Sequence, residues 1–331
     1  MTDLPLPTLA DVIAAQKTVY QFLRPTPLFH YPGLTRLVGA EVWLKHENHQ
    51  PLGAFKARGG VNLAAGLNDS QRRAGILTAS TGNHGQSIAF AGQRYHIPVT
   101  IAMPEGSNPG KVAAIQSLGA EVAFIGQDFD TAREWAAEQA RTGGGAFVGP
   151  ADFPLICGVG TYALEIINDL PSVDCIIVPV GGGSGASGVC TVAKAIKPSI
   201  EVIAVQSAQA PAAQQSWKQG QHIEAETHTF AEGIATQVPF DLPQRILRQH
   251  LDDFILVDDD DIKAAILLHL QHTHNLVEGA GAASLAAALK LRDRLAGKKV
   301  ALVVSGGNLA TEKLAAMLQD RERLLAPYLN E

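Results

Sequence analysis

The chain has 331 residues, of which 46% are apolar and 18% charged, so it can bury a core and is not intrinsically disordered. Its length fits one large domain or two of ordinary size. The net charge of -6 argues against a nucleic-acid-binding protein, which needs a basic surface for phosphate backbones. Three cysteines are too few for a disulfide framework and fit the reduced thiols of a cytoplasmic protein.

The N-terminal segment predicts neither export nor membrane insertion. Residues 1–16 lack a basic cluster ahead of an apolar stretch, so no secretory signal is expected. No apolar run reaches the roughly 18 residues that a membrane-spanning helix needs. We therefore expect a cytoplasmic protein without a membrane partner.

Short β-rich runs alternate with helix-length segments along the chain. Continuous apolar strands separated by helices indicate parallel sheets covered on both faces. The series within 75–150 and the series within 151–331 predict two α/β domains. The expected strands cover residues 76–80, 98–103, 120–126, 174–180, 200–206 and 298–307.

Two later segments have helical patterns. The Ala- and Gly-rich residues 277–291 predict a buried helix. His269, His272 and His274 follow an i, i+3, i+5 spacing, which does not converge on one metal ion as an i, i+4 pair does. We expect these to be ordinary histidines on a helix surface.

Ligands of open parallel sheets bind at the carboxyl ends of the strands. Four loops are candidates for such a site: GAFK at 53–56, STGNHG at 80–85, GGGSG at 181–185 and SGGN at 305–308.

The glycine run at 178–188 predicts an anion site. Successive glycines let backbone N–H groups converge on an anion, and the following helix adds its positive N-terminal end. Residues 183–188 formally match the dinucleotide fingerprint. The next strand, however, ends in Gln206 and Ser207 rather than in an acid that could bind a ribose hydroxyl. A phosphorylated cofactor or mononucleotide fits better than NAD, and a plain glycine-rich turn is the structural alternative.

Lys56 and the loop at 80–85 carry the other candidate chemistry. A lysine at a helix entrance is usually solvated, but Lys56 lies beside Phe55 with glycines on both sides. A buried lysine loses its proton at lower pH, and the neutral amine can form an imine with an aldehyde. The hydroxyls, amide and imidazole of the loop suit a carboxylate at a helix start, although its Ser or Asn side chains could simply cap that helix.

These segments resemble fold-type II pyridoxal-phosphate enzymes, specifically the threonine/serine dehydratase and serine racemase family. Residues 47–60, 80–89, 178–188 and 303–308 resemble its lysine, asparagine, phosphate and cofactor-nitrogen segments, in family order. The resemblance implies an α/β, two-domain fold like that of the tryptophan synthase β chain, each domain an open, mostly parallel sheet flanked by helices. Residues 1–74 and 151–331 would form the large cofactor-binding domain, and residues 75–150 the small domain.

The resemblance also implies roles for single residues. Lys56 would hold pyridoxal 5′-phosphate as a Schiff base and act as the base on the substrate Cα, and Thr81 is the second candidate catalytic residue. The other cofactor contacts would come from Phe55, Asn83, Gly181, Gly182, Gly183, Ser184, Gly185, Glu278 and Ser305. The substrate would contact Ser80, Thr81, Asn83 and His84.

The chain departs from the family pattern at several positions. Ala54 stands where family members commonly have serine. Thr81 keeps the hydroxyl that racemases of this group carry on a serine, whereas many dehydratases have alanine there. Some members bind a divalent cation near the positions of Gln206, Ala210 and Ala212, none of which is a carboxylate. We therefore expect no Mg²⁺ or Ca²⁺ site of that kind.

The implied reaction is the dehydration of a small β-hydroxy amino acid, such as L-threonine or L-serine, to a 2-oxo acid and ammonia. A homodimer is the expected assembly. The alternatives are a serine or aspartate racemase on the same scaffold and a dehydratase for a bulkier substrate such as hydroxyaspartate or phenylserine. From other classes come a nicotinamide-dependent dehydrogenase and a non-enzymatic amino-acid sensor.

Overall fold

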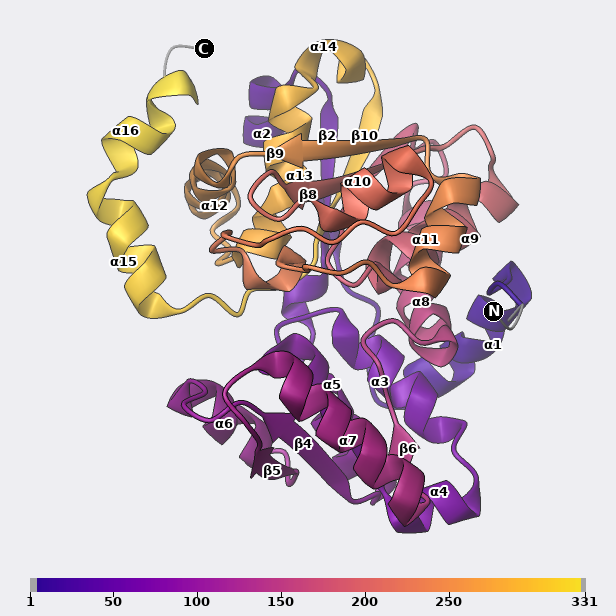
Figure 1. Ribbon diagram of the computed structural model, residues 1–331. Coiled ribbons are helices and arrows are strands. Elements are labelled where there is room, and N and C mark those ends of the chain that lie inside the picture. The colour runs from indigo at the N-terminus through magenta and orange to yellow at the C-terminus, as the bar shows by residue number, and fades with distance from the viewer. Residues whose placement is uncertain (1–4, 329–331) are drawn as a thin grey trace.

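The computed structural model describes residues 5–328, so residues 1–4 of the N-terminal segment considered above lie outside it. Six strands form the larger sheet, in the order β1-β2-β10-β7-β8-β9 (Figure 1). All neighbours in it are parallel except β1 and β2. The strands are β1 (Leu28–His30), β2 (Glu41–His46), β7 (Cys175–Pro179), β8 (Glu201–Ser207), β9 (Asp253–Val257) and β10 (Lys299–Val304).

The larger sheet is buried on both faces because its strands alternate apolar side chains between two cores. Ile177 and Leu302 point into one core, whereas Ile176 and Val303 point into the other. The first core is covered by α2 (Pro32–Val38), α12 (Asp259–Thr273) and α13 (Gly279–Lys290). The second is covered by α1 (Leu9–Val19), α8 (Phe153–Asp169), α9 (Ser184–Ile196) and α11 (Asp241–His250).

The smaller sheet has four parallel strands in the order β5-β4-β3-β6. They are β3 (Ile76–Ala79), β4 (Val99–Met103), β5 (Glu121–Phe124) and β6 (Ala146–Phe147). Around it lie α4 (Asp69–Ala74), α5 (Asn83–Tyr95), α6 (Pro109–Gln116), α7 (Phe129–Gly143) and α3 (Lys56–Ala65), which also packs against α8 of the larger unit. Figure 1 shows this unit below the larger sheet, with α3 between the two.

The remaining elements lie in the second half of the chain, except for one 3-10 turn directly after β2. They are α10 (Ala212–Gln219), α14 (Arg292–Leu295), α15 (Thr311–Gln319), α16 (Arg321–Leu325) and the 3-10 turns η1 (Glu47–His49), η2 (Glu232–Ile234) and η3 (Ala326–Tyr328). No helix among residues 5–328 combines the length and the apolar character needed to cross a bilayer.

The predicted α/β fold with two mostly parallel sheets is confirmed, and each of the six expected strands is present. The predicted buried helix is α13, in which Gly279 through Leu289 are buried. The sequence did not reveal β1, β2, β6 and β9. In β2 the charged Lys45 obscured the strand pattern, because this lysine is fully buried against an acidic partner.

The expectation of surface histidines was wrong for His269. Its side chain on α12 is fully buried, and neither ring nitrogen has a hydrogen-bond partner. Burial lowers the pKa of His269 to about 3, with smaller contributions from His46 and His272. The neutral ring is therefore part of the core of the larger sheet.

This burial predicts an acid sensitivity of folding. Between the unfolded pKa of about 6.5 and the folded value of about 3, the unfolded chain binds more protons, so stability falls as the pH falls through this range. When the pH falls from 7 to 5, burial of His269 should cost the parent protein about 2 kcal/mol of unfolding free energy. The variant His269→Leu should not show this part of the loss. Urea titrations at both pH values measure this. Replacing the exposed His222 by leucine is the control, and an equal acid loss in the His269 variant would contradict the assignment.

Candidate active site

Lys56 is the first residue of α3, and its side chain reaches the start of α9, which covers the larger sheet. Its Nζ donates to the carbonyl oxygen of Pro150 at 3.0 Å and to Oγ of Ser184 at 3.3 Å. The ammonium lies 5.4 Å from the centre of the Phe55 ring. Removal of the ammonium from water lowers the pKa of Lys56 from 10.5 to about 8. Near neutral pH a useful fraction of this amine is therefore neutral and nucleophilic.

The glycine run forms the turn between β7 and α9. Gly183 has a φ of +89°, a conformation that favours glycine, and Ser184 then begins the helix. A Cβ on Gly181 would overlap the carbonyl oxygen of Gly233, and one on Gly183 would lie 2.6 Å from Cβ of Pro243. Side chains are thus excluded where the backbone N–H groups of the turn and the helix N-terminus converge. This arrangement binds phosphate oxygens well.

Phe55 and Ser305 are held together at the end of β10. The backbone N–H of Phe55 donates to the carbonyl oxygen of Ser305 at 3.1 Å, and Ala54 and Gly306 form an isolated β-bridge. The Ser305 side chain is 4% exposed. The lysine loop is therefore fixed against the carboxyl end of the larger sheet, beside the glycine run.

The loop at 80–85 brings Asn83 to Glu278. Nδ2 of Asn83 donates to Oε1 of Glu278 at 2.9 Å, and Nδ2 of Asn308 donates to Oδ1 of Asn83 at 2.8 Å. Burial raises the pKa of Glu278 to about 7, against the opposing effect of the Asn83 hydrogen bond. A carboxyl group that is half protonated near neutral pH lies at this junction. Oγ of Ser80 accepts the backbone N–H groups of Gly82 and Gly85, so this serine also caps the helix start.

His84 and Thr81 are less directly connected to the other predicted residues. Nε2 of His84 lies 3.1 Å from Oγ1 of Thr78, so the imidazole points toward the smaller sheet. Burial, with a smaller contribution from Lys56, lowers the pKa of His84 to about 3. His84 is therefore a neutral hydrogen-bonding group. Thr81 is partly exposed in the same loop.

Three contributors were not assigned from the sequence. The carbonyl of Pro150 contacts Lys56, and the hydroxyl of Tyr162 donates to the carbonyl oxygen of Gly185 at 3.1 Å. Asn308 lies in the SGGN segment, which was recognised as a motif without a role for its asparagine. No sequence signal singled out Tyr162, because it lies within an otherwise apolar helix.

The segment at 230–240 lies against the glycine run, where Oγ1 of Thr236 donates to the carbonyl oxygen of Gly181 at 3.4 Å. The side chain of Glu232 turns instead toward two lysines, Lys111 on α6 and Lys313 on α15. The Lys111–Glu232 ion pair joins the two units of the molecule. The Lys313–Glu232 distance is 2.7 Å.

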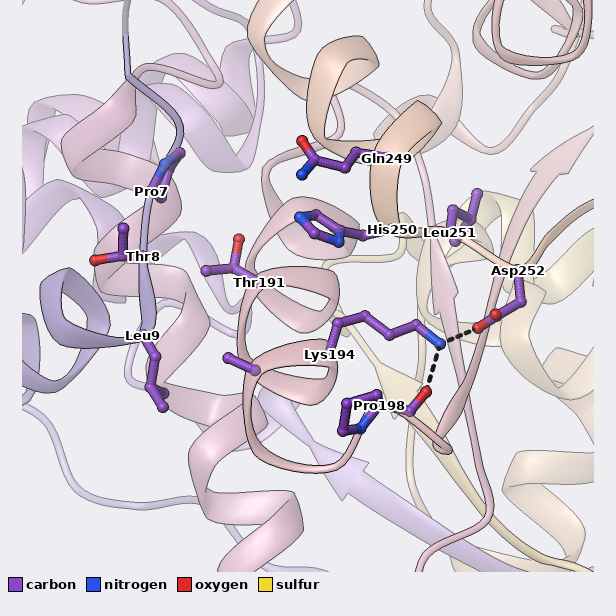
Figure 2. A pocket seen from close by; sticks show the side chains of 11 residues that line it. Pro7, Thr8, Leu9, Thr191, Lys194, Pro198, Gln249, His250, Leu251 and Asp252 are labelled. Atoms are coloured by element: carbon purple, nitrogen blue, oxygen red, sulfur yellow. Dashed lines mark hydrogen bonds and ion pairs between the residues drawn. The ribbon is translucent and has the colours of Figure 1, made fainter.

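A cavity of about 540 Å³ lies away from Lys56, between residues 7–9 and the ends of α9 and α11 (Figure 2). Its ammonium group, on Lys194, is already paired with Asp252 and donates to the carbonyl of Pro198 (Figure 2). Among residues 5–328, no group of three or more His, Cys, Asp or Glu side chains is arranged to hold a metal ion. The expected absence of a cation requirement stays a prediction, which chelation followed by Mg²⁺ addition tests.

Residues 19–306 match the family model described as pyridoxal-phosphate dependent enzyme. The chain belongs to this family. It is 40% identical over 304 residues to an L-threonine ammonia-lyase from Thermotoga maritima, covering 91% of this chain and 76% of that one. It is 33% identical to a serine racemase from Schizosaccharomyces pombe, covering 96% of this chain and 98% of that one. The structure of a processed threonine deaminase isoform 2 from Solanum lycopersicum superposes with a TM-score of 0.90 at 30% identity, covering 94% and 86%.

The residues of the enzyme fit pyridoxal 5′-phosphate. The cofactor needs an amine for its aldehyde and a turn of backbone N–H groups for its phosphate. Nζ of Lys56 lies 3.3 Å from Oγ of Ser184, the first residue of α9, which follows the glycine run. The resemblance to this family and its cofactor, inferred from four sequence segments, is confirmed by the family match.

Proposed function

We propose that the enzyme is an ammonia-lyase that converts a small β-hydroxy amino acid, such as L-threonine or L-serine, to a 2-oxo acid and ammonia. The observation that supports this proposal is the partly neutral amine of Lys56, which lies within hydrogen-bond distance of Ser184 in the glycine run. The similarity to an L-threonine ammonia-lyase supports the substrate class. When bound, the cofactor supplies an aldehyde for amino groups and a ring that draws electrons from the substrate Cα.

The side chains have separate tasks in this proposal. Lys56 would hold the cofactor through its Nζ, and once the substrate's amino group has replaced it, the free neutral Nζ would accept the Cα proton. Gly181, Gly182, Gly183, Ser184 and Gly185 would hold the phosphate through backbone N–H groups. Asn83, Glu278 and Phe55 would hold the ring, and Ser305 would serve its nitrogen. A serine hydroxyl does not hold a proton on that nitrogen as a carboxylate would, which favours prompt loss of the β-hydroxyl.

Substrate binding is assigned to the loop at 80–85. Ser80, Thr81, Asn83 and His84 stand at the N-terminus of α5, where hydroxyl and backbone N–H donors suit the substrate carboxylate. A panel of β-hydroxy amino acids, read out by 2-oxo acid formation, tests the substrate class. Threonine and serine should be converted. Exclusive turnover of hydroxyaspartate or phenylserine would move the proposal to a bulkier substrate, and no turnover would favour the amino-acid sensor.

The lowered pKa of Lys56 predicts the pH dependence of cofactor attachment. Only the neutral amine reacts with an aldehyde, so the attachment rate should rise with pH and reach half its maximum near pH 8 rather than 10.5. Stopped-flow absorbance on the cofactor-free protein measures the rate. Pyridoxal 5′-phosphate reacting with N-acetyl-lysine amide serves as the reference. A protein midpoint that coincides with this reference would show that burial does not activate Lys56.

Racemisation is the second candidate, because Thr81 keeps a hydroxyl and the similar protein from Schizosaccharomyces pombe is named a serine racemase. If Thr81 returns a proton to the opposite face of Cα, incubation with L-serine should give D-serine. The variant Thr81→Ala should then lose D-serine formation by more than about tenfold while retaining 2-oxo acid formation. Chiral chromatography measures the D-isomer, and its absence from the unmodified enzyme excludes a racemase.

The proposal also covers the location, the assembly and the domain division of the enzyme. We propose a cytoplasmic location, a homodimeric assembly, and a division into a large domain of residues 1–74 and 151–331 and a small domain of residues 75–150. Light scattering tests the assembly and fractionation tests the location. Limited proteolysis tests the domain boundaries, with cleavage expected near residues 74 and 151.

A further inference from the structure

Four fully or almost fully buried charged side chains lie close to the loop at 53–56 that carries Lys56. The side chains of Lys45, Glu47 and Arg58 are 0% exposed, and that of Glu165 is 6% exposed. Arg58 binds Glu47 through Nε and Nη2, both at 2.8 Å, and Glu165 through Nη1 at 2.6 Å and Nη2 at 2.9 Å. Lys45 pairs with Glu165 at 2.6 Å. Two positive and two negative groups thus balance one another.

Neutral donors and acceptors complete this buried charge cluster. Oγ1 of Thr26 donates to Glu47, and the backbone N–H of Thr26 donates to Glu165 at 3.1 Å. Nη1 of Arg58 donates to Oγ1 of Thr161 at 3.0 Å. The hydroxyl of Tyr20 donates to Glu165 at 2.7 Å. The cluster therefore ties together the end of α1, β2, η1, α3 and α8.

Stability alone does not account for such a cluster. Four buried charges lose their hydration, and well-packed apolar side chains of similar volume often give equal or greater stability. What the charges add is geometry, because the planar guanidinium grips two carboxylates at fixed angles that an apolar core would not impose.

The cluster lies between α3, which carries Lys56, and α8, which contacts the glycine run. Arg58 is two residues after Lys56 in the first turn of α3. On the other side, Thr161 and Glu165 flank Tyr162 on α8, and Tyr162 donates to Gly185 in the glycine run. The Tyr162 ring also meets the Phe55 ring edge-to-face, with centres 6.2 Å apart. Arg58 thus links the helix of Lys56 to the helix that supports the phosphate cradle.

We infer that Arg58 is a positioning residue, which sets the place of the Lys56 amine relative to the glycine run through its double carboxylate grip. This inference rests on the proposed role of Lys56. The formal charges of the cluster sum to zero, so it adds no net charge beside the amine. Consistent with this, burial is the cause of the lowered pKa of Lys56.

The test compares two variants of matched stability. Arg58→Lys keeps the charge but cannot grip both carboxylates with one fork. Leu34→Ala, in the first core beside α2, lowers stability without touching the cluster. In the cofactor-free protein, Arg58→Lys should attach pyridoxal phosphate to Lys56 at least about tenfold more slowly. In the loaded enzyme it should lower kcat by a similar factor while KM changes less than about threefold.

Thermal unfolding of both variants confirms that their stabilities match. Attachment and turnover in Arg58→Lys at the rates of Leu34→Ala would overturn the inference and leave the cluster a purely structural feature. If Arg58→Lys does not fold, Thr161→Val replaces it, since it removes one Arg58 contact and keeps both ion pairs. This variant should slow attachment at least about threefold, and an unchanged rate would overturn the inference.

A separate readout distinguishes failure of the inference from failure of the proposed function. Acetylation of Lys56 by acetic anhydride needs no cofactor, and fragmentation mass spectrometry assigns the acetyl group to position 56 rather than to the amine introduced at position 58. If the parent protein never attaches pyridoxal phosphate at Lys56, the proposed function fails, and acetylation alone then tests the position of the amine. A rate in Arg58→Lys within about twofold of the parent overturns the inference, and a larger difference supports it.

Discussion

Replacing Lys56 by alanine is expected to abolish 2-oxo acid formation, with kcat falling by at least about 10⁴-fold. The variant removes both the amine that attaches the cofactor and the base that accepts the Cα proton. The effect should exceed that of any neighbouring substitution, because Lys56 is the only lysine among residues 5–328 whose ammonium group donates to the glycine run at 181–185. Borohydride treatment followed by mass spectrometry should show the cofactor mass on the Lys56 peptide of the parent enzyme and none in the variant.

The control for this result is Lys17→Ala, since Lys17 is exposed on α1. It should retain both the visible absorbance and the activity. The Lys56 variant should still bind pyridoxal phosphate without a covalent bond, because the glycine cradle is intact. A Lys56→Ala protein that keeps a tenth or more of the parental kcat would place the catalytic amine elsewhere in the chain. Parent protein that stays colourless with the cofactor would instead favour the amino-acid sensor.

The sequence predicted those parts of the molecule in which local pattern and position coincide. Strands such as β7 and β8 are continuous apolar runs, which indicate buried parallel strands. The glycine run after β7 has no side chains to pack in a core, so it indicated a binding turn. Lys56 was also identifiable, although its lowered pKa depends on burial that only the fold creates. The contact between Lys56 and Ser184 joins residues 128 positions apart and could not be read from either segment alone.

The sequence could not show that a charged side chain is buried when its ion-pair partner lies far away along the chain. Lys45 and Arg58 read as surface residues until Glu165 is placed beside them by the packing of α8. The same reasoning failed for His269, because its i, i+3, i+5 spacing excludes a metal pair but does not say which helix face is covered. Glu278 was expected near the cofactor ring, but its raised pKa follows from burial beside Asn83.

Replacing Gly183 by alanine is expected to weaken pyridoxal phosphate binding by about 100-fold. The positive φ of 89° strains any side chain, and the new Cβ would lie 2.6 Å from Cβ of Pro243. Relief of this overlap must move the turn and misalign backbone N–H groups that face the phosphate. Losing two hydrogen bonds to a charged group, each worth roughly 1.5 kcal/mol or more, accounts for a change of this size. Equilibrium dialysis of the cofactor against the variant measures it.

The matched control is Gly144→Ala at the end of α7. Gly144 has a similar φ of +74°, but nothing lies within 4 Å of its would-be Cβ. This variant carries the same kind of backbone strain, about 1–2 kcal/mol, far from the glycine run, so it should lower stability and leave cofactor affinity unchanged. If both variants lose affinity equally, the loss reflects global destabilisation. If only the Gly183 variant loses it, the affinity depends on the shape of the turn between β7 and α9, because backbone strain is present in both.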